Sequence, residues 1–145
     1  MITNERQYRI AQAEAKKFDQ ALATARASKP GKDVHPRVHE AMIEALESEL
    51  AVLREQLDQY DALKAGKVKS RRVHSLRELP VLLIEGRIAA GLTQRELAER
   101  LDRAEQQIQK YEATMYAGAS LERLQEVADA LKLEIEERVS YSIPA

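Results

Sequence analysis

Residues 91–112, with the sequence GLTQRELAERLDRAEQQIQKYE, have the pattern of two short helices joined by a tight turn. Leu97 and Leu101 lie four residues apart in the first helix, and Ile108 and Tyr111 lie three residues apart in the second. Each helix therefore has a single apolar face. Only a few residues separate the two patterns, so one helix must turn sharply into the other. This segment constrains the fold more than any other part of the chain.

The start of the first of these helices is marked twice. Gly91 suits the left-handed backbone conformation in which a preceding helix ends, because glycine has no Cβ. Thr93 and Glu96 have the spacing of a capping box, in which two side chains accept hydrogen bonds from the first backbone amides of a helix. We therefore expect one helix to end at Gly91 and the next to begin near Thr93.

Four motifs occur in order: GLTQ at 91–94, ELAERL at 96–101, IQKYE at 108–112 and SLERLQEVADAL at 120–131. Through this ordered combination the segment resembles the lambda-repressor-like, or Xre-type, helix-turn-helix domain, over roughly residues 79–133. The resemblance implies a small helical domain whose second motif helix enters the major groove of DNA.

Two positions depart from the pattern of that family. Asp102 stands where the family usually has glycine, but aspartate tolerates the left-handed conformation better than most residues, so we expect the turn to be kept. Ala104 stands where Ser or Thr often caps the second helix, and its side chain cannot cap. Asp102 and Glu105 have capping-box spacing, which offers this helix an earlier start.

The polar side chains of the second motif helix face outward once its apolar residues point inward. Glutamine can pair with N6 and N7 of adenine, and lysine can reach guanine or a phosphate. The resemblance implies base contacts from Gln106, Gln107 and Lys110, and a phosphate contact from Gln94 at the start of the preceding helix. Glu105 would repel phosphates unless it accepts a hydrogen bond from cytosine. The candidate DNA-binding residues are Gln94, Arg95, Arg103, Glu105, Gln106, Gln107, Gln109 and Lys110.

Other residues could bind the phosphate backbone. Arg95 and Arg103, with Tyr116 and Ser120 in the following loop, are candidates for such contacts. The stretch 64–77 contains six basic residues and no acidic one. It fits two interpretations equally: an arm that follows the DNA backbone, or a solvated strand that pairs with the acidic C-terminal segment.

The N-terminal half has the pattern of two long helices. Apolar residues step alternately by three and four over residues 3–28 and again over 36–65, and Pro30, Gly31 and Asp33 break the chain between them. The pattern predicts an antiparallel hairpin or coiled coil, packed within one chain or completed by a second copy. The two stripes are Tyr8, Ala11, Ala15, Phe18, Leu22 and Ala25, and Ile43, Leu46, Leu50, Leu53, Leu57 and Tyr60.

Two further helices and a strand are expected beyond Gly66. Ser75 and Glu78 mark the start of the helix that leads into the motif, and Ser120 is the N-cap candidate of the last helix. After that helix, Leu133, Ile135, Val139, Tyr141 and Ile143 keep to alternate positions, which predicts a strand. We expect this strand to pair with Lys67–His74.

The composition excludes several classes of protein. The sequence contains no cysteine, so disulfides and thiolate metal sites are excluded, and no apolar run is long enough to span a membrane. We expect a cytoplasmic protein that does not associate with membranes. The net charge of −1 gives no general basic signature for nucleic-acid binding, so DNA binding must depend on a local surface.

We expect neither a metal, nor a cofactor, nor catalysis. His35 and His39 lie four residues apart, but no third ligand follows at a suitable spacing. The sequence contains no glycine-rich phosphate loop, nucleophile elbow or HExxH motif. Its carboxylates are spread over solvent-facing sides of helices.

The expected fold is mainly α. A hairpin or coiled coil over residues 1–65 would serve dimerisation or partner binding, and a lambda-repressor-like helix-turn-helix domain over residues 66–145 would carry a small β element made by the linker and the C-terminal strand. The expected function is that of a homodimeric, sequence-specific regulator, a repressor, which binds operator half-sites about one helical turn, ~34 Å, apart.

Three interpretations of its role stay open. The resemblance extends to HigA-type antitoxins, which implies a toxin partner and repression of the protein's own operon. A free-standing prophage or host repressor would need no toxin. In a different class, the N-terminal helices would form an assembly module that does not bind DNA. The features that favour this alternative are Asp102, Ala104 and Glu105.

Overall fold

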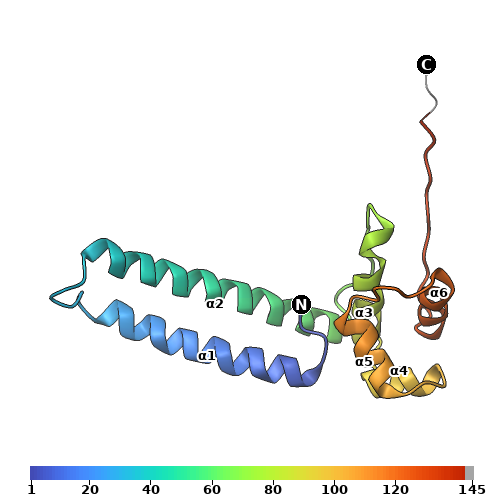
Figure 1. Ribbon diagram of the computed structural model, residues 1–145, viewed down its shortest axis with the longest axis horizontal. Coiled ribbons are helices and arrows are strands. Elements are labelled where there is room, and N and C mark those ends of the chain that lie inside the picture. Colours follow the sequence, from blue (N-terminus) through green and yellow to red (C-terminus); the bar gives the residue numbers. More distant parts are fainter. Residues whose placement is uncertain (143–145) are drawn as a thin grey trace. The chain divides into compact units, whose positions relative to one another are not determined.

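The computed structural model describes residues 1–142, which contain helices and no strand (Figure 1). By their internal contacts the residues form two compact units: residues 1–72 with 88–93, and residues 73–87 with those from 94 onward. Within the described residues, no helix combines the length and the apolar character needed to cross a membrane. The helices are α1 (Glu5–Ala27), α2 (Pro36–Lys64), α3 (Leu79–Ala89), α4 (Gln94–Arg100), α5 (Glu105–Ala113) and α6 (Leu121–Ala130), with a short 3-10 turn, η1 (Leu76–Glu78), before α3.

Both long helices begin at residues that cap them. The side chain of Asn4 accepts a hydrogen bond from the backbone amide of Gln7 at 2.9 Å, which starts α1. Pro36 occupies the first turn of α2, where its missing N–H costs nothing, and Nδ1 of His35 accepts from the amide of Arg37 at 3.2 Å. The two helices and the break between them are confirmed.

The helices α1 and α2 run antiparallel, side by side (Figure 1). Ion pairs show the direction, because the residue number falls along α1 as it rises along α2: Arg26 pairs with Glu47, Asp19 with Arg54 and Glu5 with Lys64. The Lys64 ammonium hydrogen-bonds the Glu5 carboxyl at 3.0 Å and holds the pKa of that carboxyl below its ordinary value. All three ion pairs fit the same antiparallel register of the hairpin.

The apolar seam of the hairpin is thin. Ala15, Leu22 and Leu50 are buried at its centre. Two helices can cover only one side of each other, so most of the long side chains at the seam stay partly exposed. Those partly buried residues are Phe18, Ile43, Leu46, Leu53 and Leu57.

The second unit has a fully enclosed core. Each of its four helices contributes a side chain with no exposed surface: Leu83 from α3, Leu97 from α4, Ile108 from α5 and Val127 from α6. Gly86 lies in the middle of α3, where a Cβ would come within 2.9 Å of the side chain of Leu133. Glycine at this position therefore allows the segment after α6 to pack closely against α3.

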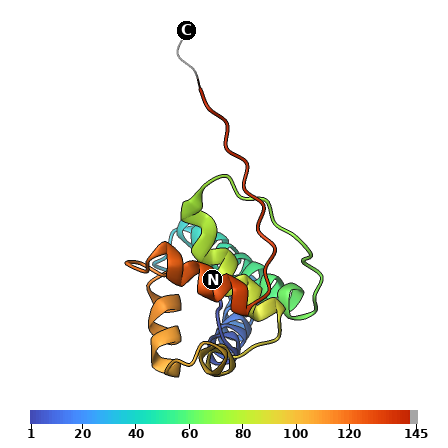
Figure 2. The same ribbon diagram turned by 90° about the vertical axis from the view of Figure 1, so that its right-hand side faces the viewer.

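The predicted β element is wrong for the described residues. The segment after α6 runs as an extended chain with no partner strand up to Ser142 (Figures 1 and 2), and the linker 67–74 is neither helix nor strand. Ile143, the last residue of the expected strand, lies outside the described residues. Alternating polarity favours an extended backbone, but a two-stranded ladder is marginal without a further apolar layer. The polar linker offers no such layer, so the expected pairing with Lys67–His74 does not form.

Candidate nucleic-acid interface

The turn between α4 and α5 is closed by backbone hydrogen bonds. The amide of Arg103 donates to the carbonyl of Ala98 at 2.9 Å, and the amide of Asp102 donates to that of Glu99 at 3.2 Å. Asp102 has a φ of +52°, so the expectation that aspartate would adopt the left-handed conformation of the usual glycine is confirmed. Figure 2 shows α4 nearly end-on and α5 from the side, so the two helices cross.

The start of α5 differs from the expectation of an earlier cap. The helix begins at Glu105, and Ala104 is its N-cap residue with no side-chain hydrogen bond. Asp102 cannot act as the cap because its backbone is committed to the left-handed turn that ends α4, whereas an N-cap residue is extended. The N-terminus of α5 therefore has no side-chain cap and lies directly after the turn.

One face of α5 is polar and exposed. Gln106 and Lys110 lie one helical turn apart on it, and within the described residues neither side chain makes a hydrogen bond or an ion pair. Ile108 points the opposite way, with none of its surface exposed. The pair Gln106 and Lys110 thus presents an amide and an ammonium group to solvent side by side.

Three other predicted residues of α5 are engaged locally. Nε2 of Gln109 donates to Glu105 at 3.0 Å, and both side chains are exposed. Nε2 of Gln107 donates to the hydroxyl of Tyr111 at 3.0 Å, and Gln107 is half-buried. These two bonds hold three polar side chains along the helix beside the Gln106 and Lys110 pair.

The predicted residues outside α5 are divided between the surface and the interior. Arg95 is exposed on α4 and pairs with Glu99 at 3.0 Å. Arg103 follows the turn, and its guanidinium lies 3.9 Å from the carboxylate of Glu126 on α6. Gln94, by contrast, is only 9% exposed. The structure therefore brings the two arginines to the surface and Gln94 into the domain.

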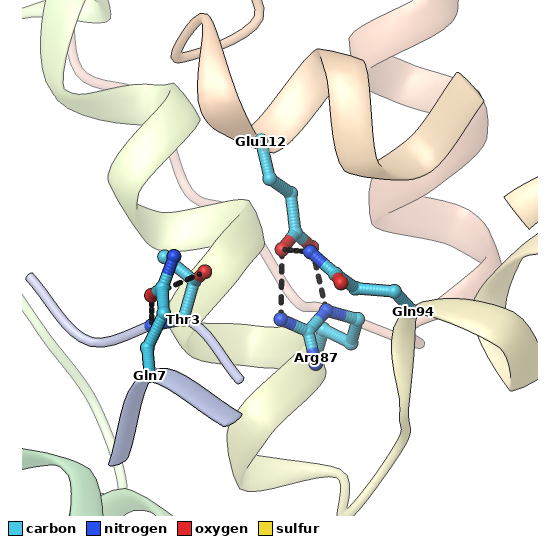
Figure 3. Close-up of polar contacts among 5 residues, drawn as sticks. All are labelled: Thr3, Gln7, Arg87, Gln94 and Glu112. Carbon is cyan, nitrogen blue, oxygen red and sulfur yellow. Dashed lines mark hydrogen bonds and ion pairs between the residues drawn. The ribbon is translucent and has the colours of Figure 1, made fainter. Parts of the chain in front are cut away.

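Gln94 belongs to a buried charged network that joins three helices (Figure 3). Glu112 on α5 accepts two hydrogen bonds from Arg87 on α3, at 2.5 and 2.8 Å, and one from Nε2 of Gln94 on α4, at 2.8 Å. The side chains of Arg87 and Glu112 are only 3% and 1% exposed. Because both ions are removed from water, their bonds fix α5 firmly against α3 and α4.

Arg87 and Glu112 were not among the residues singled out from the sequence. A signal for them exists, since Glu112 lies four residues after Ile108 and Arg87 three residues after Ile84, each on the buried face of its helix. A charged residue on such a face requires a partner of opposite charge. The sequence cannot say which of the many charged residues that partner is.

The loop after α5 corrects one further expectation, the phosphate contact of Tyr116. Tyr111, expected to point inward with Ile108, is half-buried and stacks on Tyr116 with ring centroids 5.5 Å apart. Tyr116 is only 3% exposed, and burial raises the pKa of its phenol. Its hydroxyl therefore does not reach the surface as a phosphate contact would require. Ser120 caps α6 by accepting from the amide of Arg123 at 3.2 Å, as predicted.

Comparison with known proteins points to the same part of the chain. A family model described as helix-turn-helix matches residues 83–138, from α3 into the segment after α6. No curated protein and no solved structure matches the chain. The matched family consists of DNA-binding transcriptional regulators. Residues 83–138 thus match a helix-turn-helix family of DNA-binding regulators, and the resemblance of this part of the chain to the Xre-type, or lambda-repressor-like, domain is confirmed.

Proposed function

We propose that this protein is a sequence-specific DNA-binding repressor that acts as a homodimer and reads base edges with α5. The observation that carries the proposal is the exposed pair Gln106 and Lys110, whose side chains are uncommitted within the described residues. They lie on a helix that the buried Arg87–Glu112 pair holds in place. Fixed presentation matters because bidentate contacts to bases require defined geometry.

Each candidate residue has a role that suits its surroundings. Gln106 would pair with adenine, and Lys110 would contact guanine or a phosphate. Gln107 would join them by exchanging its hydrogen bond to Tyr111 for one to a base. Glu105 and Gln109, which are bonded to each other, would together read a cytosine or the base next to it. Arg95 and Arg103 would hold phosphates on either side of the turn. Gln94 would contribute through the amides at the start of α4, since Glu112 already binds its side-chain amide.

A single helix-turn-helix reads few base pairs, so two copies are needed for affinity. We assign the pairing to the hairpin, where Ile10, Phe18, Ala21 and Leu46 line an apolar groove of about 490 Å³. Two charged residues, Glu14 and Lys17, complete its lining, and neither has an ion-pair partner within the described residues. In an interface with two-fold symmetry, Glu14 can face the partner's Lys17 and the reverse. This self-complementary charge favours a second copy of the chain.

The DNA-binding proposal is tested by fluorescence anisotropy with a duplex from upstream of the protein's own gene. Gln106→Ala should raise Kd by about 5- to 150-fold, the range for a lost bidentate base contact. Gln125→Ala removes an exposed glutamine from α6 of the same domain and should leave Kd unchanged. Equal binding by the wild type, Gln106→Ala and Lys110→Ala proteins would refute base reading by α5.

The pairing proposal is tested by sedimentation equilibrium. Glu14→Lys should weaken the dimer because it places like charges against each other, and adding Lys17→Glu to the same chain should restore the dimer. Lys16→Glu changes the charge at a residue outside the groove lining and serves as the control. A wild-type protein that stays monomeric at all concentrations would exclude this dimer.

A second candidate function is that of an antitoxin that represses its own operon. The exposed apolar residues of the hairpin favour it, because Ile10, Val38, Met42 and Val52 are each about half exposed or more and DNA binding does not need them. A toxin encoded next to this gene and co-purifying with the protein through the hairpin would support the candidate. If no toxin gene lies next to this gene, the interpretation as a free-standing repressor is favoured. A protein that assembles through the hairpin but binds no DNA would be the assembly module.

A further inference from the structure

The linker between α2 and α3 carries a concentration of positive charge. Residues 67–77 contain Lys67, Lys69, Arg71, Arg72 and Arg77 and no acidic residue. All five side chains are exposed, and residues 67–73 have no regular secondary structure. Figure 2 shows this stretch as a green irregular coil that leads into α3. We call residues 67–77 the basic arm.

Four of the five charges of the basic arm are not neutralised by ion pairs within the described part of the chain. Lys67, Lys69, Arg72 and Arg77 form no ion pair there, whereas Lys64, just before the arm, is paired with Glu5. The predicted pairing of strands would have placed the acidic segment after α6 against the arm. Within residues 1–142 the two segments form no β-ladder. The structure therefore does not favour neutralisation of the arm by that segment, which was one of the two interpretations that the sequence left open.

The basic arm is joined directly to the domain that carries α5. Its last residues form η1, where Ser75 accepts from the amide of Arg77 at 3.2 Å, and η1 leads straight into α3. The Arg87–Glu112 pair ties α3 to α5. Eight extended residues reach up to about 26 Å, so residues 67–74 can extend over several nucleotides from that anchor.

We propose that the basic arm binds the phosphate backbone of DNA beside the site contacted by α5. The inference rests on the proposed function. The ligand chemistry is the phosphodiester, because lysine and arginine side chains on an irregular backbone suit a row of negative charges, whereas contacts to base edges require side chains held in a defined geometry. The arm adds affinity without adding sequence preference, and its contribution falls as salt rises, because each neutralised phosphate releases counterions.

The test compares two variants that lose the same charge. The arm variant is Lys67→Gln, Lys69→Gln, Arg71→Gln and Arg72→Gln together. The matched control changes four exposed cations of the hairpin and its loop, as Lys16→Gln, Lys29→Gln, Lys32→Gln and Arg37→Gln. Kd for the upstream duplex and for a scrambled duplex is measured from about 50 to 200 mM salt.

We expect the arm variant to lower the slope of log Kd against log salt by about 2–4, since each lost phosphate contact removes about 0.9. Affinity for both duplexes should fall by the same factor, and the control should keep the wild-type slope. A charge-conserving variant, with Lys67→Arg, Lys69→Arg, Arg71→Lys and Arg72→Lys, should also keep it. Circular dichroism of each variant reports its folding.

The possible failures are distinguishable. If the wild type binds the upstream duplex and the arm variant keeps its slope, the arm inference is wrong and the proposed function stands. An equal loss in the hairpin control would show an effect of net charge alone and would also overturn the inference. Loss confined to the upstream duplex would mean base reading by the arm, contrary to the proposal. No binding of any duplex by the wild type overturns both proposals.

Discussion

The hairpin and the helix-turn-helix domain handle charge and apolar surface in opposite ways. In the hairpin, the ion pair Asp19–Arg54 is 49% and 58% exposed, and long apolar side chains such as Leu57 are only partly covered. In the domain, Arg87 and Glu112 are almost completely buried, and Leu97 has no exposed surface. Two helices leave one side of each open, whereas four short helices enclose a centre.

The proposed function gives each of the two regions a different role. An element that presents side chains to bases needs a fixed orientation, and buried charged bonds supply it for α5. An element that associates with a second chain needs apolar surface that its own fold leaves open, and the hairpin has that surface. The following predictions test the contrast, from the largest expected effect to the smallest.

Removal of the buried carboxylate should have the largest effect. Glu112→Ala takes away the group that neutralises Arg87 inside the domain and should lower the free energy of unfolding by about 3–5 kcal/mol. Glu99→Ala removes the exposed partner of Arg95 and should cost less than about 1 kcal/mol. Urea denaturation followed by circular dichroism measures both. Similar losses in the two variants would mean that the Arg87–Glu112 pair does not hold the domain.

Truncation of a leucine should cost more in the domain than in the hairpin. Leu97→Ala leaves a cavity in an enclosed core and should cost about 2–5 kcal/mol. Leu57→Ala, at a half-exposed seam, should cost less because water can fill the space. Amide hydrogen exchange by NMR resolves the local loss in each unit. A larger loss for Leu57→Ala than for Leu97→Ala in dilute monomer would reverse the comparison.

The exposed pair Asp19–Arg54 should contribute little despite its two short contacts of 2.7 and 2.9 Å. A double-mutant cycle with Asp19→Asn and Arg54→Gln should give a coupling of about 0.2–1 kcal/mol that declines with added salt. The cycle is measured by urea denaturation at low and high salt. A salt-independent coupling of several kcal/mol would place this pair in the same class as the buried one.

Tyr116→Phe should have the smallest effect, with the opposite sign. Among the described residues the buried hydroxyl of Tyr116 finds no hydrogen-bond partner, so its removal should leave stability unchanged or raise it slightly. The ring keeps its stack on Tyr111. Thermal unfolding of the variant and the wild type gives the comparison. A clear fall in Tm would show that the hydroxyl has a partner in solution.

Much of the helical fold could be predicted because its signals are local. Pro36 and Ser120 start helices, Gly91 has a φ of +70° at the end of α3, and Asp102 makes the left-handed turn. Each of these effects acts within one helical turn, where neighbouring residues decide it. The exposed position of Gln106 and Lys110 follows in the same way from the buried position of Ile108.

The rest depended on partners that no local pattern names. Alternation of polarity after Leu133 predicted a strand, but a strand requires a neighbour, and none is present in residues 1–142. Gln94 was expected at the surface, yet Glu112 draws its side chain inward. The assignment of the predicted residues to DNA contacts, and of residues 1–65 and 66–145 to separate domains, stays a prediction.

The sequence by itself determined where helices begin and end, which of their faces are apolar, and the turn that joins α4 to α5, because steric preferences and helical periodicity act over a few residues. Only the tertiary structure decided that Arg87 and Glu112 meet, that Gln94 joins them, and that the segment from Leu133 to Ser142 forms no strand. Burial and ion pairing depend on groups far apart in the chain, and the chain must fold before those groups can meet.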